Sequence, residues 1–387
     1  MHPPPIELHT HFVTDTFSKL NLLGLMEIAW NSPYVIPEEV MRGPYGYRLV
    51  LRTTDASRAF TSLVQNLGSV IERREIDEVL GLLRYDFVKN NVYEVRKLVR
   101  GNEGQQALAQ ALQQAGVIHS RGASKKGSPT LFLAPDLGKF GTYKIPYESS
   151  YPNPLDNVGN QRISLCTVLS LIGFSFRTFR MTITRRGTQR HACALLAPVS
   201  RLGYRGVRIL YSISGRLAEY SRISEEALRR LARGRRGGEE GEIAEPSSLA
   251  ILAFLAPVLK DAAPYTGSGL EGIEIVLYSV TIEGGKQYVR KQYVRELVLQ
   301  PARYVANLPD ALAGAMLARY EELPALLLKA PDFFNTLGEY LVSGDERLYV
   351  EALRELASFV HQASSDRNSA WLSKPARFLL RNSSRSL

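Results

Sequence analysis

The spacing of apolar residues predicts strands and helices in mixed order over the first third of the chain. Residues 6–13 alternate apolar and polar positions, which is the period of a half-buried strand. Residues 17–30 carry apolar side chains at helical spacing, and this helix is expected to end before Pro33. Residues 47–53 predict a second strand. Helical spacing then continues through 55–67, 70–100 and 103–115, the last ending at Gly116.

Two loop-like stretches interrupt this pattern. Residues 120–129 form a basic loop rich in glycine and serine, which precedes a short strand at 130–134. This loop is either a solvated surface loop or a flexible contact to phosphate. From residue 135 to 160, prolines, tyrosines and asparagines replace any apolar period. A long irregular connection of this kind is usually functional or disordered.

The centre of the chain predicts a buried helix followed by a hairpin. Residues 163–172 are apolar on all sides and stop at Gly173. The elements expected after it are strands at 174–184 and 189–199, a strand at 207–214, a helix at 224–232 and a mobile loop, basic and then acidic, at 233–245. A second buried helix is expected at 249–259.

The last part of the chain predicts one more hairpin and then helices only. Strand patterns at 273–282 and 288–299 flank the turn Glu283-Gly-Gly285. Helical spacing follows at 308–322, 323–342 and 346–362. The fold class expected is therefore α+β: a mixed α/β N-terminal body with β-hairpins at 1–300, then a C-terminal helical bundle with a basic tail at 301–387.

Composition indicates an ordinary globular protein. The chain has 387 residues, of which 45% are hydrophobic and 22% charged, so a large core and about two domains are expected. Cys166 and Cys193 have apolar neighbours and are expected to be reduced thiols, which predicts a cytoplasmic protein. The N-terminus lacks the pattern of a signal peptide. The apolar run at 248–259 is too short for a bilayer, so no membrane partner is expected.

Positive charge is concentrated in one segment. Residues 177–236 hold fifteen arginines and three glutamates, a local net charge of +12, whereas the whole chain carries +10. The remainder is therefore close to neutral. Arginine suits bidentate contact with phosphate. Arginine preference also suits a GC-rich or thermophilic host, and this second reading weakens the functional one.

Familiar catalytic and metal-binding patterns are not found in the sequence. His9 and His11 would share a strand face, but no cysteine or acidic cluster joins them. His191 and Cys193 lack the third group that orients a catalytic base. The glycine-rich loop lacks the Gly-Lys-Ser/Thr order of a phosphate-binding loop. We therefore expect a protein that is not an enzyme, with no cofactor and no metal.

Arginines and phenylalanines occur together around the expected hairpin, which favours nucleic-acid binding. Phe174, Phe176 and Phe179 are either stacking platforms for bases or core residues behind a solvated arginine face. The residues expected to contact nucleic acid are Arg121, Lys125, Lys126, Arg177, Arg180, Arg185, Arg186, Arg190, Arg201 and Arg205.

Several short segments resemble one known family, the large subunit of the archaeal type I-A CRISPR interference (Cascade) complex. These segments are the helix containing Leu22-Leu-Gly-Leu-Met-Glu-Ile28 and the loop Asn153–Asn160, which leads into Cys166 and Leu169–Gly173. Leu196-Ala-Pro-Val and Leu255-Ala-Pro-Val also fit, as does the helical C-terminal third. The resemblance covers most of the chain through short, degenerate motifs.

The resemblance implies a non-catalytic role in antiviral defence. Such subunits lie beside the 5′ end of the crRNA, help to read the protospacer-adjacent motif and stabilise the displaced strand of target DNA. The partners implied are crRNA, target DNA, the backbone and small subunits, the helicase and the nuclease. Two alternatives remain: another basic RNA- or DNA-binding protein of a ribonucleoprotein, or an enzyme acting on nucleic acid. A backbone subunit would normally have a compact β-α-β-β-α-β core without a helical C-terminal third.

Overall fold

The chain folds into two compact units. The computed structural model describes residues 5–10, 15–43, 46–83, 86–114, 130–132, 162–185, 188–233, 246–262, 270–285, 288–366 and 369–383. Unit 1 comprises Met1–Thr178 and Leu195–Gly215, and unit 2 comprises Phe179–Ala194 and Arg216–Leu387. The chain therefore passes from unit 1 to unit 2 and back before it finishes in unit 2.

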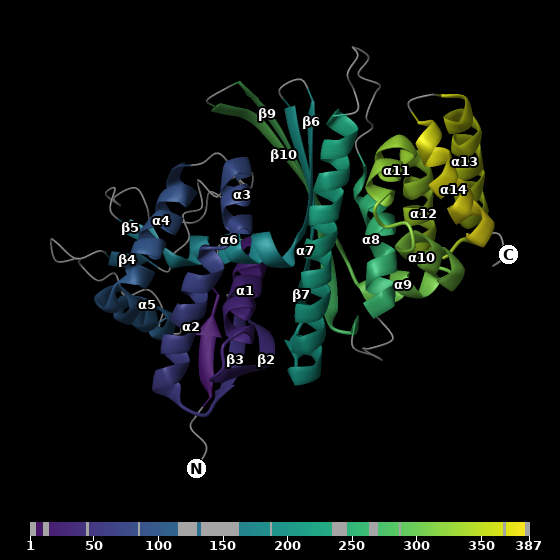
Figure 1. The fold of residues 1–387 in the computed structure, drawn as a ribbon. Coiled ribbons are helices and arrows are strands. Elements are labelled where there is room, and N and C mark those ends of the chain that lie inside the picture. The colour runs from purple at the N-terminus through teal and green to yellow at the C-terminus, as the bar shows by residue number, and fades with distance from the viewer. Residues whose placement is uncertain are drawn as a thin grey trace. The chain divides into compact units, whose positions relative to one another are not determined.

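A four-stranded antiparallel sheet organises unit 1 (Figure 1). Its strands are β1 (Ile6–His9), β2 (Val35–Gly43), β3 (Gly46–Thr53) and β8 (Arg201–Leu202), in the order β1-β3-β2-β8. Helix α1 (Asp15–Trp30) connects β1 to β2, and β3 lies between these two strands. This is a split β-α-β arrangement, and α2 (Ala56–Ile71) follows β3.

The two faces of this sheet differ in character because side chains alternate along each strand. One row across the four strands consists of Leu8, Leu49, Val40 and Leu202, all buried. This inner face packs on α1, whose residues are buried without interruption from 18 to 29. A helix buried all round lies in the interior of its unit.

Helices α1 and α6 (Leu165–Arg177) approach each other closely at two glycines. A methyl group added at Gly24 would lie 1.9 Å from the backbone oxygen of Leu169. One added at Gly173 would lie 2.1 Å from the backbone oxygen of Leu20. Glycine is therefore required on both helices for this packing.

Three further helices and a pair of short parallel strands belong to unit 1. They are α3 (Arg74–Leu83), α4 (Asp86–Arg100) and α5 (Asn102–Gln114), with β4 (Thr130–Phe132) and β5 (Arg162–Ser164). Arg96 on α4 donates from Nε to the Ile71 carbonyl oxygen at 3.0 Å and from Nη1 to Asp77 at 3.0 Å. These bonds fasten α4 to the end of α2 and to α3.

A second antiparallel sheet belongs mainly to unit 2. Its strands are β6 (Phe179–Arg185), β7 (Thr188–Pro198), β9 (Ile273–Gly285) and β10 (Tyr288–Leu299), in the order β10-β9-β7-β6. The expected hairpin around Gly284 and Gly285 is confirmed by the β9–β10 register, in which Tyr288 pairs with Gly285. The hairpin of β6 and β7 is confirmed as well.

Helices form the rest of unit 2. They are the second part of α7 (Tyr204–Arg233), α8 (Ser248–Ala262), α9 (Pro301–Asn307), α10 (Asp310–Leu317), α11 (Leu323–Lys329), α12 (Pro331–Ser343), α13 (Glu346–Ser365) and α14 (Ala370–Ser383). Phe254 of the buried helix α8 has its ring centroid 5.6 Å from those of Phe179 and Tyr220 and 6.4 Å from that of Phe334. This aromatic group joins β6, α7, α8 and α12 in one core.

The α+β class with a helical C-terminal region is confirmed, but one expected strand is wrong. Residues 207–214 lie in α7, which also absorbs the expected helix at 224–232. The buried residues Val207, Leu210 and Leu217 recur at helical spacing, a period that an eight-residue window does not resolve. Ser224 donates to the Tyr220 carbonyl oxygen at 2.7 Å inside this helix and does not cap it.

One strand boundary and one whole strand also differ from expectation. The segment expected as a strand at 174–184 begins as the end of α6, and β6 starts only at Phe179. Strand β2 had no prediction, because its pairing with β3 shifts register between Pro37 and Glu39. Such an irregularity breaks the two-residue period that marks a strand.

The unit boundaries differ from the expected division at residue 300. Helix α8 packs on β9 and on α9, α10, α11 and α12, so the second sheet shares its core with the C-terminal helices. The expected loops at 120–129 and 135–160 lie outside the described residues. Of the expected loop at 233–245, Arg233 is the last residue of α7, and residues 234–245 lie outside the described residues.

Candidate nucleic-acid interface

Arg177, expected to contact nucleic acid, is buried inside unit 1. Its side chain is 10% exposed, and its Nε donates to Glu27 Oε2 at 2.6 Å. Nη1 donates to the Tyr211 carbonyl oxygen at 3.0 Å, and the guanidinium carbon lies 3.4 Å from the centroid of the Tyr211 ring. The predicted phosphate contact of Arg177 is therefore corrected: this guanidinium is engaged by a carboxylate in the core.

Arg177 belongs to a group that we name the Glu27 cluster, comprising Glu27, Arg73, Arg177 and Tyr211. The Glu27 carboxylate, 3% exposed, also accepts from Arg73 Nη1 at 3.3 Å and from the Tyr211 hydroxyl at 3.3 Å. Trp30 stacks on the Tyr211 ring at 4.3 Å between centroids. Burial is the main cause that raises the pKa of Tyr211 to about 12.

Arg180 is likewise buried, within unit 2. Its Nε donates to Glu225 Oε1 at 3.1 Å, and the two side chains are 5% and 13% exposed. The Arg180 backbone N–H donates to Ser221 Oγ at 3.1 Å, and this hydroxyl donates to the Arg180 carbonyl oxygen at 2.7 Å. The predicted nucleic-acid contact of Arg180 is corrected for the same reason as that of Arg177. Arg180 instead holds β6 against the second part of α7.

Six of the other expected contact residues remain predictions. Arg185 and Arg190 lie on the backbone of the β6–β7 hairpin, where Arg185 pairs with Thr188 and Ile183 pairs with Arg190. The remaining four, which are Arg121, Lys125, Lys126 and Arg186, lie outside the described residues.

The last two expected contact residues, Arg201 and Arg205, are exposed where β8 leads into α7. The Arg201 side chain is 71% exposed, and its Nη2 donates to Glu39 Oε2 at 2.8 Å. Arg205 and Arg208 are exposed on the first turns of α7. The Arg208 guanidinium carbon lies 5.7 Å from the centroid of the Tyr204 ring, which is itself 46% exposed.

Strand β2 adds a fourth arginine at this place. Arg42 is exposed, and its backbone N–H donates to the Ser200 carbonyl oxygen at 2.8 Å, directly before β8. We name this surface of unit 1 the arginine corner and define it as Arg42, Arg201, Tyr204, Arg205 and Arg208. An exposed aromatic ring among guanidinium groups is suited to binding a phosphodiester chain and stacking on a base.

The outward face of the sheet continues this surface. The pairings of His9 with Arg48, Arg48 with Met41 and Met41 with Arg201 place these four residues in one row, next to the buried leucine and valine row. Glu7 partly neutralises the row, because its carboxylate lies 3.0 Å from Arg48 and 3.6 Å from His9. The balance of positive charge therefore lies toward the β8 edge of the sheet.

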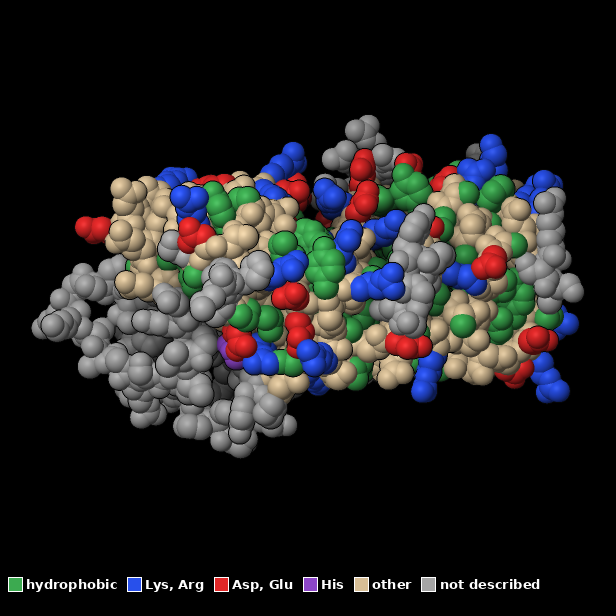
Figure 2. Space-filling view, turned by 90° about the horizontal axis from the view of Figure 1, so that it is seen from below, with side chains coloured by type: hydrophobic (Ala, Val, Ile, Leu, Met, Phe, Trp, Pro, Cys, Tyr) green, Lys and Arg blue, Asp and Glu red, His purple; other side chains and the backbone are tan. Residues whose placement is uncertain are grey.

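Opposite charges are mixed elsewhere on the protein, on the face that Figure 2 shows and in ion pairs of unit 1. On the face drawn in Figure 2, Lys and Arg side chains are interspersed with Asp and Glu side chains. Within unit 1, for example, Arg74 pairs with Glu78 at 2.9 Å and Arg100 pairs with Glu72 at 2.9 Å. Mixed surfaces of this kind serve solubility, whereas an unbalanced group of arginines attracts anions.

Sequence reasoning missed Arg42, Arg48 and Arg208 as candidates. The apolar pattern predicts a strand around Arg208 and no regular element around Arg42. The alternation of β3 does place Arg48 on the face opposite the buried Leu49 and Leu51. That signal was available, but the neighbouring strands were needed to show which residues share the face.

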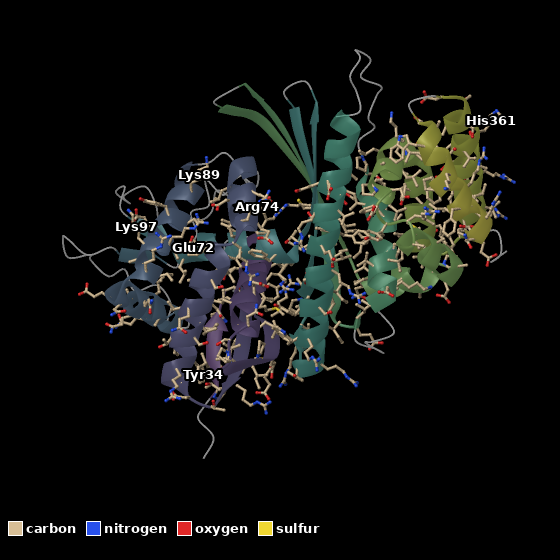
Figure 3. The ribbon with its side chains drawn as sticks, in the orientation of Figure 1. Tyr34, Glu72, Arg74, Lys89, Lys97 and His361 are labelled. Carbon is tan, nitrogen blue, oxygen red and sulfur yellow. The ribbon has the colours of Figure 1, made fainter. Side chains whose placement is uncertain are left out.

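The described residues include no group of three or more His, Cys, Asp or Glu side chains placed to hold a metal ion. His361, labelled on α13 in Figure 3, is exposed, and His11 lies outside the described residues. Cys193 is a buried thiol. No helix in the described part of the chain has both the length and the apolar character needed to cross a bilayer.

The chain was compared with protein-family models and with curated proteins. No family model matches it, and no curated protein matches it either.

Proposed function

We propose that the chain is a non-catalytic, nucleic-acid-binding subunit of a CRISPR effector complex of type I-A. In this role it contributes to binding of the crRNA 5′ end and of target DNA, to recognition of the protospacer-adjacent motif, and to recruitment of the helicase and nuclease. The proposal also places the chain in the cytoplasm. The resemblance of the Leu22–Ile28 and Asn153–Asn160 segments supplies the type of complex. The arginine corner supports the binding of nucleic acid.

The arginine corner supports binding to phosphates through charge and geometry together. Arg205 and Arg208 are three residues apart on α7, so they project from neighbouring positions on one side of the helix. Their planar guanidinium groups suit bidentate contact with phosphate oxygens. In a guide-directed complex such contacts hold the backbone, while base pairing with the guide carries most of the sequence information.

The proposal is tested by measuring the affinity of the full chain for duplex DNA over a range of salt concentrations. We expect the double variant Arg205→Ala/Arg208→Ala to lose two phosphate contacts. The slope of log affinity against log salt should then become shallower by about 1.8. A slope equal to that of the native chain contradicts the role of the corner.

A matched control keeps the change of charge and moves it elsewhere in unit 1. Arg58 and Arg74 are 67% and 87% exposed and pair with Asp55 and Glu78; Arg74 is labelled in Figure 3. The variant Arg58→Ala/Arg74→Ala should keep the native slope. Equal losses in both double variants would mean that net charge, and not the corner, determines binding.

The assignment to a CRISPR complex needs a separate test. A tagged chain purified from its native host should retain crRNA together with backbone and small subunits. Recovery of the chain with RNA of unrelated origin contradicts this assignment while leaving nucleic-acid binding intact.

One observation favours a second candidate, another RNA- or DNA-binding protein of a ribonucleoprotein. Unit 1 has the element order β1-α1-β2-β3-α2 with β3 between β1 and β2, which are the first five elements of a ferredoxin-like domain. RNA-binding domains of that architecture stack bases on sheet aromatics. The outward positions of β1 and β3 instead carry Glu7, His9, Arg48, Val50 and Arg52, so contact through phosphates is favoured.

A further inference from the structure

The outer face of α14 combines an exposed tryptophan with three cations. Trp371, Lys374, Arg377 and Arg381 are exposed, and their spacing of three, three and four residues puts them on one side of the helix. Trp371 is 49% exposed. The sequence of α14, Ala370–Ser383, contains no acidic residue. We name these four residues the α14 face.

The opposite side of α14 is firmly packed within unit 2. Leu372, Pro375, Ala376 and Leu379 are buried where α14 contacts α10, α11 and α13. The Tyr349 hydroxyl of α13 donates to the Ser383 carbonyl oxygen at 3.4 Å. The helix therefore presents its exposed side chains from a fixed backbone, which lowers the entropic cost of binding.

Arg377 of this face and the adjacent Phe378 both contact residues outside α14. Arg377 Nη2 donates to Ser364 Oγ of α13 at 2.8 Å. The Arg319 guanidinium carbon lies 4.8 Å from the Phe378 ring centroid, and its Nη1 lies 3.4 Å from the Glu322 carboxylate. Arg377 is thus oriented along the α13–α14 pair while its side chain stays accessible.

We propose that the α14 face binds single-stranded nucleic acid, with a base stacked on Trp371 and phosphates on Lys374, Arg377 and Arg381. The inference rests on the proposed function for its ligand and adds a contact surface in unit 2. Proteins that bind single strands combine a stacking ring with cations along the backbone. Successive cations lie about 4.5 Å and 6 Å apart along the helix axis, so one extended strand can reach all three.

Charge and shape favour a nucleic acid over an acidic polypeptide. Both ligands would neutralise the three cations, but a planar base also covers the flat indole ring of Trp371. An acidic polypeptide leaves that ring without a planar partner. The two ligands therefore differ in the effect that they have on the tryptophan itself.

The chain offers a direct spectroscopic test because it contains two tryptophans. The other one, Trp30, is half-buried and stacked on Tyr211 in unit 1. In a Trp30→Phe variant all tryptophan fluorescence comes from Trp371. We expect oligodeoxythymidylate to quench this emission over the same concentration range in which anisotropy of a labelled oligonucleotide reports binding.

A second variant gives the same information if the Trp30→Phe chain does not fold. The Trp371→Phe chain keeps Trp30, so the difference between its titration and that of the native chain isolates the signal of Trp371. The Trp371→Ala chain should bind oligodeoxythymidylate between about 5-fold and about 150-fold more weakly, the range expected for loss of one stacked base.

The phosphate contacts are tested by the salt dependence of binding. Lys374→Ala/Arg377→Ala should make the slope of log affinity against log salt shallower by about 1.4 for a single strand. Arg347 and Arg354, exposed on the neighbouring helix α13, give a matched control. Arg347→Ala/Arg354→Ala should leave both the slope and the quenching of Trp371 unchanged.

The possible outcomes separate this inference from the proposed function. If the native chain binds no nucleic acid, the proposed function and this inference both fail. If it binds oligodeoxythymidylate without quenching Trp371, and with the native slope in Lys374→Ala/Arg377→Ala, only the inference fails. Binding of poly-glutamate in place of oligodeoxythymidylate also overturns it, because the face would then serve an acidic protein.

Discussion

Replacing Glu27 by alanine removes the one carboxylate that the structure pairs with the buried Arg177. The guanidinium of Arg177 would keep its donor bond to the Tyr211 carbonyl oxygen and its contact with the Tyr211 ring. It would lose both bonds to Glu27 Oε2 while remaining in a site where the native side chain is 10% exposed. Leaving one partner of a buried ion pair unpaired costs about 3–5 kcal/mol.

This free energy converts into a large change in melting temperature. Unit 1 contains about 200 residues, and for a domain of that size each kcal/mol lowers the melting temperature by about 2–4 °C. We therefore expect unit 1 of the Glu27→Ala chain to melt roughly 6–20 °C below that of the native chain. Arg177→Ala should have a smaller effect, because Arg73 still lies 3.3 Å from the remaining carboxylate.

Differential scanning calorimetry of the full chain measures the change, and a double variant tests its cause. In Glu27→Leu/Arg177→Met no buried charge of the pair is left, so the loss should be smaller than that of Glu27→Ala alone. If Glu27→Ala melts within about 1 °C of the native chain, the pair does not stabilise unit 1. If the losses of Glu27→Leu and Arg177→Met, each measured alone, simply add in the double variant, the two charges are not coupled. Either result refutes the reasoning.

Three further predictions concern packing, pH and the two kinds of arginine. Gly24→Ala should cost about 3 kcal/mol, the upper end of the usual cost of overpacking, because its methyl group meets an α6 backbone oxygen at 1.9 Å. Gly81→Ala, with open space around it, should instead stabilise α3 by about 0.5–1 kcal/mol in denaturant unfolding. Tyr211 has its pKa raised from 10.0 to about 12, so its contribution to stability is present below pH 10 and lost as pH rises to about 12. Tyr211→Phe should flatten that alkaline decline in melting temperature, and an unchanged decline would contradict the assignment. Because Arg180 is buried, Arg180→Ala should lower the melting temperature. Because Arg205 is exposed, Arg205→Ala should weaken DNA binding and leave the melting temperature unchanged.

Local periodicity predicts the elements that pack by regular burial. The helix at 17–30 and the hairpin around Gly284 follow from spacing and turn residues alone, and the structure confirms both. Strand β2 escapes prediction because of its register shift after Pro37, and the start of α7 because a short window of apolar residues fits two periods.

The candidate site is predicted only in part, because exposure depends on distant partners. Arg177 and Arg180 look like Arg201 and Arg205 in the sequence. Glu27 lies 150 residues from Arg177, and Glu225 lies 45 residues from Arg180. A count of charge within a window contains no information about carboxylates at such separations. Residues 177–236 are therefore rich in arginine, but some of these arginines are buried in the core and others are exposed at the surface.

The return of the chain from unit 2 to unit 1 has a consequence for synthesis on the ribosome. Unit 1 needs Leu195–Gly215 to be complete, and this segment begins within β7, after the turn of the β6–β7 hairpin. The bond between Tyr211 and Glu27 joins residues 184 positions apart, so the Glu27 cluster cannot close until much of the chain has emerged. Until then Glu27 and Arg177 lack the Tyr211 ring, and long-range closure of this kind is slow. A fragment ending at residue 178 would lack β8 and the arginine corner's α7 residues, so unit 1 cannot be isolated by a single cut.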